Sequence, residues 1–281
     1  VSDRLRLQSR GPGAPEVPWL VTGREAAGWL AHVDDPAPYL GLPARSHARS
    51  RELLDRRERS LASTQEHYFV DPPQIERGWR HLLIDVDGRV YLDMVNNVTS
   101  IGHAHPRLTA AVARQVARLN TNSRFHYGAI VDFAEKLAET LPDTLDTVFL
   151  VNSGSEAVDL AVRIAMAAPA RRDVVAVREA YHGWTDASDA ISTSVADNPQ
   201  ALATRPDWVH TVESPNSYRG RLRGSDAAAY GPAAAEAISR LAAEGALPAA
   251  SISGTLYVNA GGVSLPDGYL AEVYAAVRAV G

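Results

Sequence analysis

Lysine is almost missing from this chain of 281 residues. Among the 28 basic residues, Lys136 is the single lysine and all the others are arginine. Arginine stays protonated at any accessible pH and cannot form a Schiff base or act as a general base, whereas lysine can do both. Any covalent amine chemistry must therefore use Lys136 or a lysine outside this sequence.

Cysteine is absent as well, which excludes disulfides, cysteine-ligated zinc and a thiol nucleophile. No apolar run is long enough to span a bilayer, and the first ten residues lack the apolar core of a secretory signal. The formal net charge of −5 argues against a nucleic-acid or anionic-membrane partner. We therefore expect a cytoplasmic protein. Its first residue, Val1, suggests a cropped chain, although an alternative start codon would explain it equally well.

The first third of the chain differs from the rest. Residues 1–60 are rich in Pro and Arg and show no regular alternation of strands and helices, so we interpret them as a linker or appended segment. Within them, the mixed charges of residues 51–59 favour a solvated helix with ion pairs between successive turns. Residues 81–95 alternate apolar and polar side chains around Asp87-Gly88, which predicts a β-hairpin.

From residue 106 onward, helical and extended patterns alternate. Apolar residues at helical spacing predict helices at 106–119, 129–141, 155–168, 226–245 and 268–280. Short apolar runs predict strands at 146–151, 173–177, 208–212 and 249–253. This alternation predicts a parallel sheet with helices on both faces. The rhythm calls for another strand after Gly281, so we expect the sheet to continue beyond this sequence.

Residues 152–156 (Asn-Ser-Gly-Ser-Glu) join a predicted strand to a predicted helix. Backbone N–H groups and the positive helix end converge there, Gly154 lets an anion approach, and Ser153 and Ser155 add hydroxyl donors. The alternative is an ordinary capped helix with Ser153 or Ser155 as N-cap and Glu156 near the dipole. Neither a Walker A loop nor a dinucleotide turn is present, so a compact phosphorylated cofactor fits better than a nucleotide.

A second loop, residues 179–184 (Glu-Ala-Tyr-His-Gly-Trp), directly follows a predicted strand. Ligands bind at the carboxyl ends of strands in parallel sheets, so this loop is expected near Gly154. Tyr181 could present its ring to a planar cofactor, with Gly183 leaving room for it. The alternative is that Tyr181 and Trp184 simply cover the core beneath the loop.

Two polar segments precede these loops. His103 and His105 could ligate a metal, but no carboxylate or third histidine is nearby to complete a set, so they are expected to shape a loop and cap the helix that begins at Pro106. Arg124 could hold a carboxylate or phosphate with its guanidinium group, or it could be a surface arginine on a turn.

Four segments together resemble the class III aminotransferase family of pyridoxal 5′-phosphate enzymes. They are YLDMVNNVTSIGHAHP at 91–106, NTNSRF at 120–125, FLVNSGSEAVDLAVRIA at 149–165 and REAYHGW at 178–184. The resemblance covers residues 61–281 and is nearest to the subgroup that contains ethanolamine-phosphate phospho-lyase.

The resemblance implies an α/β protein with the type I fold of pyridoxal-phosphate enzymes. Its large domain has a mostly parallel sheet with helices on both faces, a small domain is built from both chain ends, and the complete protein is a homodimer. In this chain the resemblance implies a linker at 1–60, the N-terminal part of the small domain at 61–120, and an incomplete large domain at 121–281.

The resemblance also implies roles for individual residues. Gly154 and Ser155, with Ser153 beside them, would hold the cofactor phosphate; Tyr181 would stack on the pyridine ring, and His182 would lie next to it. The candidate substrate contacts, from the segments most like the phospho-lyase subgroup, are Asn97, Asn122 and Arg124.

The catalytic lysine and the aspartate that pairs with the pyridinium nitrogen are expected beyond Gly281, so no catalytic residue is predicted within this chain. Lys136 stands in no context like the family's lysine motif, and we interpret it as a surface helix residue. Gly254-Thr255 replace a glutamate that usually lines the family's site.

The resemblance therefore implies an aminotransferase for a primary amine or amino acid, or a phospho-lyase for substrates like phosphoethanolamine. The absent lysine and Gly254 support a rival from another class, a non-catalytic truncated pseudoenzyme or interaction module of the same fold. A less favoured rival is a different phosphate-ligand enzyme on a doubly wound sheet. No metal is expected.

Overall fold

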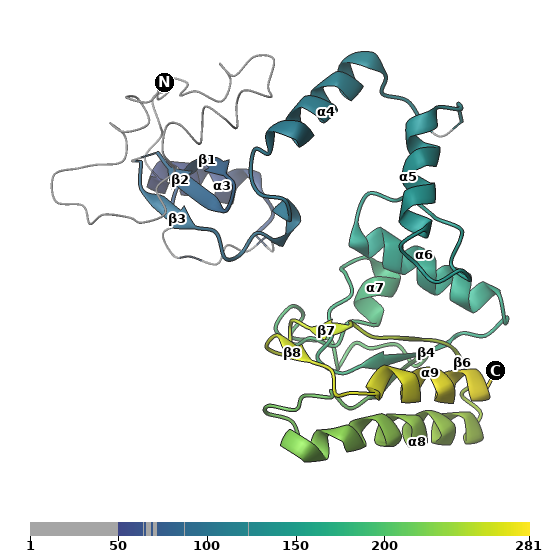
Figure 1. Ribbon diagram of the computed structural model, residues 1–281. Helices are drawn as coiled ribbons and strands as arrows, with labels where there is room; N and C mark the ends of the chain where they lie inside the picture. The colour runs from purple at the N-terminus through teal and green to yellow at the C-terminus, as the bar shows by residue number, and fades with distance from the viewer. Residues whose placement is uncertain (1–49, 64, 66–68, 70–71, 87, 123) are drawn as a thin grey trace. The chain divides into compact units, whose positions relative to one another are not determined.

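The computed structural model describes residues 50–63, 65, 69, 72–86, 88–122 and 124–281 (Figure 1). These residues form two compact units that divide between His126 and Tyr127. Apart from its last residues, the predicted linker lies outside the described part of the chain. The helix expected around residues 51–59 is confirmed as α3, Ser50–Ser60.

The first unit contains a three-stranded antiparallel sheet in the order β1-β2-β3. Its strands are Ile75–Trp79, Leu82–Asp85 and Val90–Leu92. The predicted hairpin is confirmed as β2 and β3, with Gly88 at φ 82° in the connection. The buried Asp85 carboxylate accepts hydrogen bonds from Arg89 N at 2.8 Å and from the Tyr91 hydroxyl at 2.9 Å, so its charge is compensated locally.

The expectation that no carboxylate lies near His103 is wrong. The chain leaving β3 brings Asp93 back to this histidine, and Asp93 Oδ2 lies 2.6 Å from His103 Nε2. Asp93 also accepts the N–H of Asn96, and these bonds hold the pKa of its carboxyl well below the usual value. Within the described ranges no cluster of three or more metal-ligating side chains occurs.

The described residues of the first unit also form a 3₁₀ turn at Asn97–Thr99 and helix α4 at Pro106–Arg118. The predicted helix start at Pro106 is confirmed. His105 occupies the N-cap position, but its side chain makes no capping hydrogen bond, so that part of the expectation is wrong.

The second unit contains the predicted parallel sheet. Strands β4 (Asp173–Val177), β5 (Val209–Val212) and β6 (Pro248–Ile252) are ordered β5-β4-β6 and pair in parallel. Four of the five residues of β4 are buried, as expected for a central strand covered on both faces. A short antiparallel pair, β7 (Leu256–Tyr257) and β8 (Val263–Ser264), follows β6.

Alternate residues of β4 point to two different helix layers. Val175 and Val177 pack with helices α8 (Tyr230–Ala243) and α9 (Tyr269–Ala279) in one apolar core. Val174 and Ala176 pack on the other face with α6 (Gly154–Ala167) and α7 (Asp186–Ala190). Figure 1 shows α8 and α9 side by side. The predicted helices on both faces of the sheet are thus confirmed.

The strand predicted at residues 146–151 is wrong. This segment pairs with no strand among the described residues, and the side chains of Phe149, Leu150 and Val151 are exposed. A strand needs a neighbour for its backbone groups, and this segment pairs with neither edge strand of the β5-β4-β6 sheet. The segment therefore has strand composition without a strand partner.

Helix α5, Gly128–Ala138, confirms the periodicity found at 129–141 but buries none of its side chains. Lys136 is exposed on this helix, as expected for a surface residue. Among the described helices, none has the length and apolar character needed to cross a bilayer.

Candidate functional site

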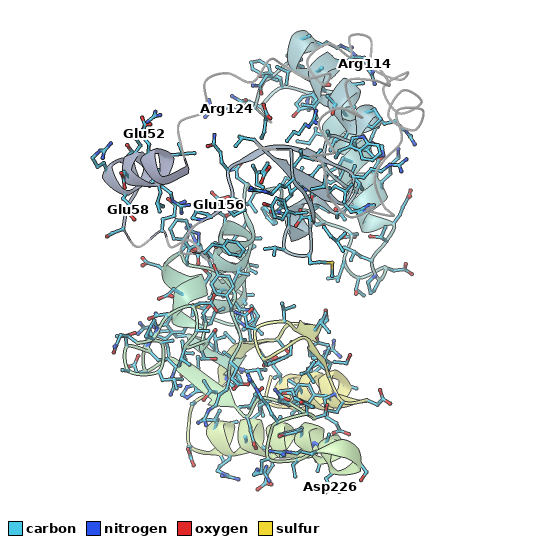
Figure 2. The ribbon with its side chains drawn as sticks, turned by 90° about the vertical axis from the view of Figure 1, so that its left-hand side faces the viewer. Glu52, Glu58, Arg114, Arg124, Glu156 and Asp226 are labelled. Atoms are coloured by element: carbon cyan, nitrogen blue, oxygen red, sulfur yellow. The ribbon has the colours of Figure 1, made fainter. Side chains whose placement is uncertain are left out.

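The start of helix α6 is capped by its own side chains. Ser153 has an extended backbone, and its Oγ accepts a hydrogen bond from Glu156 N at 3.2 Å. The Glu156 carboxylate in turn accepts from Asn152 N at 2.7 Å. Figure 2 shows Glu156 on this helix. The capped-helix interpretation is correct, with Ser153 as the N-cap.

Capping still leaves room for an anion at this helix start. No described residue accepts a hydrogen bond from the backbone N–H of Gly154 or Ser155, and a Cβ added to Gly154 would meet nothing within 4 Å. Both amides point out of the first helical turn, where the helix dipole favours negative charge. The two interpretations of residues 152–156 are therefore compatible.

The loop of residues 179–184 packs directly against this helix start. Trp184 N donates a hydrogen bond to Ser155 Oγ at 3.3 Å. Gly183 has φ 139°, and a Cβ added to it would lie 2.6 Å from Ser155 Oγ and 2.6 Å from Ser188 Oγ, so only glycine fits here. The structure thus brings the two sequence motifs together, although only the second of them follows a strand.

Neither aromatic ring of this loop covers the core. Tyr181 is 45% exposed and Trp184 is 80% exposed, so the alternative that they simply cover the core is wrong. Part of the Tyr181 side chain is therefore accessible to a ligand.

His182 is largely buried beside Tyr181. Its backbone N–H donates to Ser192 Oγ at 2.8 Å, and its Nε2 has no hydrogen-bond partner within the described residues. Burial lowers the pKa of His182 to about 4, so the imidazole is neutral at pH 7. A buried ring nitrogen without a partner is uncommon in folded proteins.

Three hydroxyl residues behind the loop were missed by the sequence reasoning. Thr185, Ser188 and Ser192 connect the loop to α6 and α7 through side-chain hydrogen bonds. Ser188 and Ser192 are fully or almost fully buried. The available signal was the density of small hydroxyl residues in TDASDAISTS, residues 185–194.

The predicted substrate contacts lie in the other unit. Asn97 belongs to the 3₁₀ turn, the Asn122 side chain accepts Arg124 N at 3.0 Å, and Arg124 is exposed (Figure 2). The structure groups these residues with the first unit and the cofactor candidates with the second. Their role in substrate binding stays a prediction.

Gly254 follows β6, where the family usually has a glutamate. A Cβ added to Gly254 would lie 3.1 Å from Leu256 O, so even a small side chain would need the β7 backbone to shift. The local path of this chain is therefore adapted to glycine.

These features define an α/β protein with a parallel sheet and a candidate anion site at the start of α6. The residues fit pyridoxal 5′-phosphate, because free amides at a helix start suit the phosphate and the exposed Tyr181 side chain suits a planar ring.

Comparison with known proteins gives the family. The class III aminotransferase family model matches residues 64–279, and this chain belongs to that family. The fold is that of type I pyridoxal-phosphate enzymes, and the family implies pyridoxal 5′-phosphate as cofactor.

Two relatives and one solved structure illustrate the match. An alanine–glyoxylate aminotransferase 2-like protein of Drosophila melanogaster is 35% identical over 86% of this chain and 50% of its own length. Ethanolamine-phosphate phospho-lyase homolog 1 of Caenorhabditis elegans is 35% identical over 65% of this chain and 39% of its own. A phospholyase from Arthrobacter, solved with phosphoethanolamine, superimposes with a TM-score of 0.71 at 30% identity, covering 81% of this chain and 54% of its own. This chain thus spans about half the length of its relatives.

Proposed function

We propose that this chain supplies the cofactor-binding part of a pyridoxal-phosphate-dependent enzyme that acts on a primary amine or amino acid. The main support is the hydrogen bond from Trp184 N to Ser155 Oγ, because it holds the start of α6 and the loop of residues 179–184 next to each other. Membership of the class III aminotransferase family supports this proposal.

The helix start would hold the cofactor phosphate. The N–H groups of Gly154 and Ser155 donate to its oxygens, and the hydroxyl proton of Ser153 remains free because its Oγ serves the cap only as an acceptor. The amide of Asn152 is already taken by Glu156, so the phosphate is confined to the first turn of α6.

The loop would hold the pyridine ring. Tyr181 offers a ring face for stacking, and the neutral His182 ring next to it adds no positive charge at pH 7. When bound, the cofactor supplies a carbonyl carbon that condenses with amines and an electron-withdrawing ring.

Two reaction outcomes are open to such an enzyme, transfer of the amino group or elimination of a β-phosphate. The similarity to the phospholyase from Arthrobacter and to the phospho-lyase homolog of C. elegans supports the second. We propose Asn97, Asn122 and Arg124 as contacts of the substrate phosphate or carboxylate. In the full-length protein, Arg124→Ala should reduce turnover of phosphoethanolamine. Unchanged turnover of both phosphoethanolamine and amino-acid donors would contradict this role.

A non-catalytic protein is the second candidate. Its support is that the single lysine, Lys136, is exposed on α5, a helix with no buried side chain, and that Gly254 carries no carboxylate. We propose that Lys136 is not the covalent anchor of the cofactor. We also propose that the protein is cytoplasmic and that the complete protein is a homodimer.

Binding and labelling test the cofactor site and the assignment of Lys136. The 281-residue chain is titrated with pyridoxamine 5′-phosphate, which needs no lysine, and separately treated with pyridoxal 5′-phosphate and borohydride before mass spectrometry. The proposal expects saturable binding and no adduct on Lys136. Absence of binding would contradict the cofactor site, and a stoichiometric Lys136 adduct would contradict the assignment of Lys136.

A further inference from the structure

Four residues with hydroxyl side chains are connected by hydrogen bonds that involve their hydroxyl groups and their backbone. We name this set, Ser155, Thr185, Ser188 and Ser192, the hydroxyl clasp. Thr185 Oγ1 lies 2.8 Å from Ser188 Oγ and 3.4 Å from Ser155 O, and Thr185 N donates to Ser188 Oγ at 3.0 Å. The clasp therefore ties the segment after the loop to the first turn of α6.

The clasp is anchored at its base by a charged group. Ser188 N donates to Asp159 Oδ1 at 2.7 Å, and Asp159 lies one turn further along α6 than Ser155. Hydrogen bonds to a carboxylate are stronger than those between neutral groups. This bond fixes α7 against α6 and so fixes the position of Ser188.

Ser192 connects the clasp to the ring-binding loop. Its side chain is buried, its Oγ accepts the N–H of His182 at 2.8 Å, and it donates to Ser188 O at 2.7 Å. The same hydroxyl lies 3.3 Å from Gly183 O. One side chain thus holds the backbone on both sides of the His182–Gly183 peptide.

We propose that Ser192 is a positioning residue that sets the distance between the ring-binding residues Tyr181 and His182 and the phosphate-binding start of α6. This inference rests on the proposed cofactor site. A phosphorylated pyridine gains affinity from contacting both parts at once, and that gain depends on their fixed separation. Inorganic phosphate contacts only the helix start, whose cap does not include Ser192.

The test compares two probes on the 281-residue chain. Calorimetric titration measures the dissociation constants of pyridoxamine 5′-phosphate and inorganic phosphate for the wild type, Ser192→Ala and Ser192→Thr. We expect Ser192→Ala to weaken the binding of pyridoxamine 5′-phosphate at least about tenfold and the binding of phosphate less than about twofold. Ser192→Thr keeps the hydroxyl and should restore most of the lost affinity. Ser239→Ala, an exposed serine on α8 that bonds the carbonyl of Ala235, is the matched control and should change neither constant.

A measurement without ligand tests the positioning directly. The His182 amide should exchange its hydrogen at least about tenfold faster in Ser192→Ala than in the wild type, because its acceptor is gone. Should Ser192→Ala fail to fold, Thr185→Val removes a less buried member of the clasp and is expected to show the same selective loss of pyridoxamine 5′-phosphate.

The outcomes are distinct. If a folded Ser192→Ala variant loses affinity equally for both probes, or loses no affinity for pyridoxamine 5′-phosphate, the positioning role is overturned and the proposed function is left intact. If the wild type binds neither pyridoxamine 5′-phosphate nor phosphate, the proposed function is overturned and this inference with it.

Discussion

At the scale of single residues, His182 couples the candidate site to the stability of the fold. Its pKa of about 4 lies below the usual 6.5 because burial disfavours the charged ring. Between these two values the unfolded chain binds more protons than the folded chain. The contribution of His182 is therefore complete above pH 6.5 and is lost as the pH falls towards 4.

This difference predicts a pH-dependent loss of stability. We expect the free energy of unfolding to fall by on the order of 2 kcal/mol between pH 7 and pH 4.5 through His182 alone. Denaturant unfolding of the wild type and of His182→Gln, which does not titrate, measures the difference between their pH profiles. Parallel profiles for the two proteins would show that His182 is not buried as a neutral ring.

Gly183 carries a steric prediction. Gly183→Ala places a Cβ 2.6 Å from two hydroxyl oxygens at a φ of 139°, so the loop must move away from α6. We expect a loss of about 2 to 4 kcal/mol in the free energy of unfolding, measured by denaturant titration. Gly128→Ala is the matched control, because its added Cβ meets nothing within 4 Å at the start of α5, and it should be neutral or slightly stabilising.

At the scale of elements, helix α6 depends on the cap that also shapes the candidate anion site. Ser153→Ala removes the acceptor of Glu156 N and should lower the free energy of unfolding by about 1 kcal/mol. Chemical denaturation measures this loss, with Ser239→Ala in the middle of α8 as a control expected to change stability by less than about 0.5 kcal/mol. An undiminished stability of Ser153→Ala would mean that the Ser153 hydroxyl is not needed for the cap.

The elements also show what the sequence can predict. The β-hairpin, helices α6, α8 and α9, and the three parallel strands were predictable, because each has a periodic apolar face and a partner that buries it. Helix α4 was predictable from its periodicity alone, since Leu108, Val112 and Val116 remain exposed. The segment 146–151 has the same composition, but pairing depends on a neighbouring strand that composition cannot reveal.

The candidate site divides in the same way. Ser153, Gly154 and Gly183 were found from local patterns of caps and turns, which neighbouring residues determine. The contact between Asp93 and His103 and the role of Ser192 depend on chain segments that return from ten residues away. Such contacts depend on how the chain folds back on itself. For Ser192 the density of hydroxyl residues in the sequence was the only signal, and for the Asp93–His103 contact there was none.

At the scale of the whole molecule, the second unit has one well-packed region and one uncovered region. The sheet, α8 and α9 bury large side chains such as Ile238 and Tyr230 completely or almost so. By contrast, α5 and the segment after it leave several large apolar side chains exposed: Val131, Phe133, Leu137, Leu141, Leu145, Phe149, Leu150 and Val151. Exposed apolar surface of this density is unusual for a soluble monomer and favours association.

This uncovered surface predicts that the 281-residue chain associates in solution at micromolar concentrations. Phe149→Glu places a charge at a side chain that is 66% exposed, so it should weaken association while costing little folding free energy. Sedimentation velocity over a concentration series measures the change. Tyr218→Glu introduces the same charge at an aromatic side chain that is 80% exposed but lies after β5, away in sequence from this surface, and should leave association unchanged. If the wild type stays monomeric at the highest concentration, the predicted association does not occur. If both variants weaken association equally, the residues of α5 and 146–151 do not drive it, and net charge or another surface does.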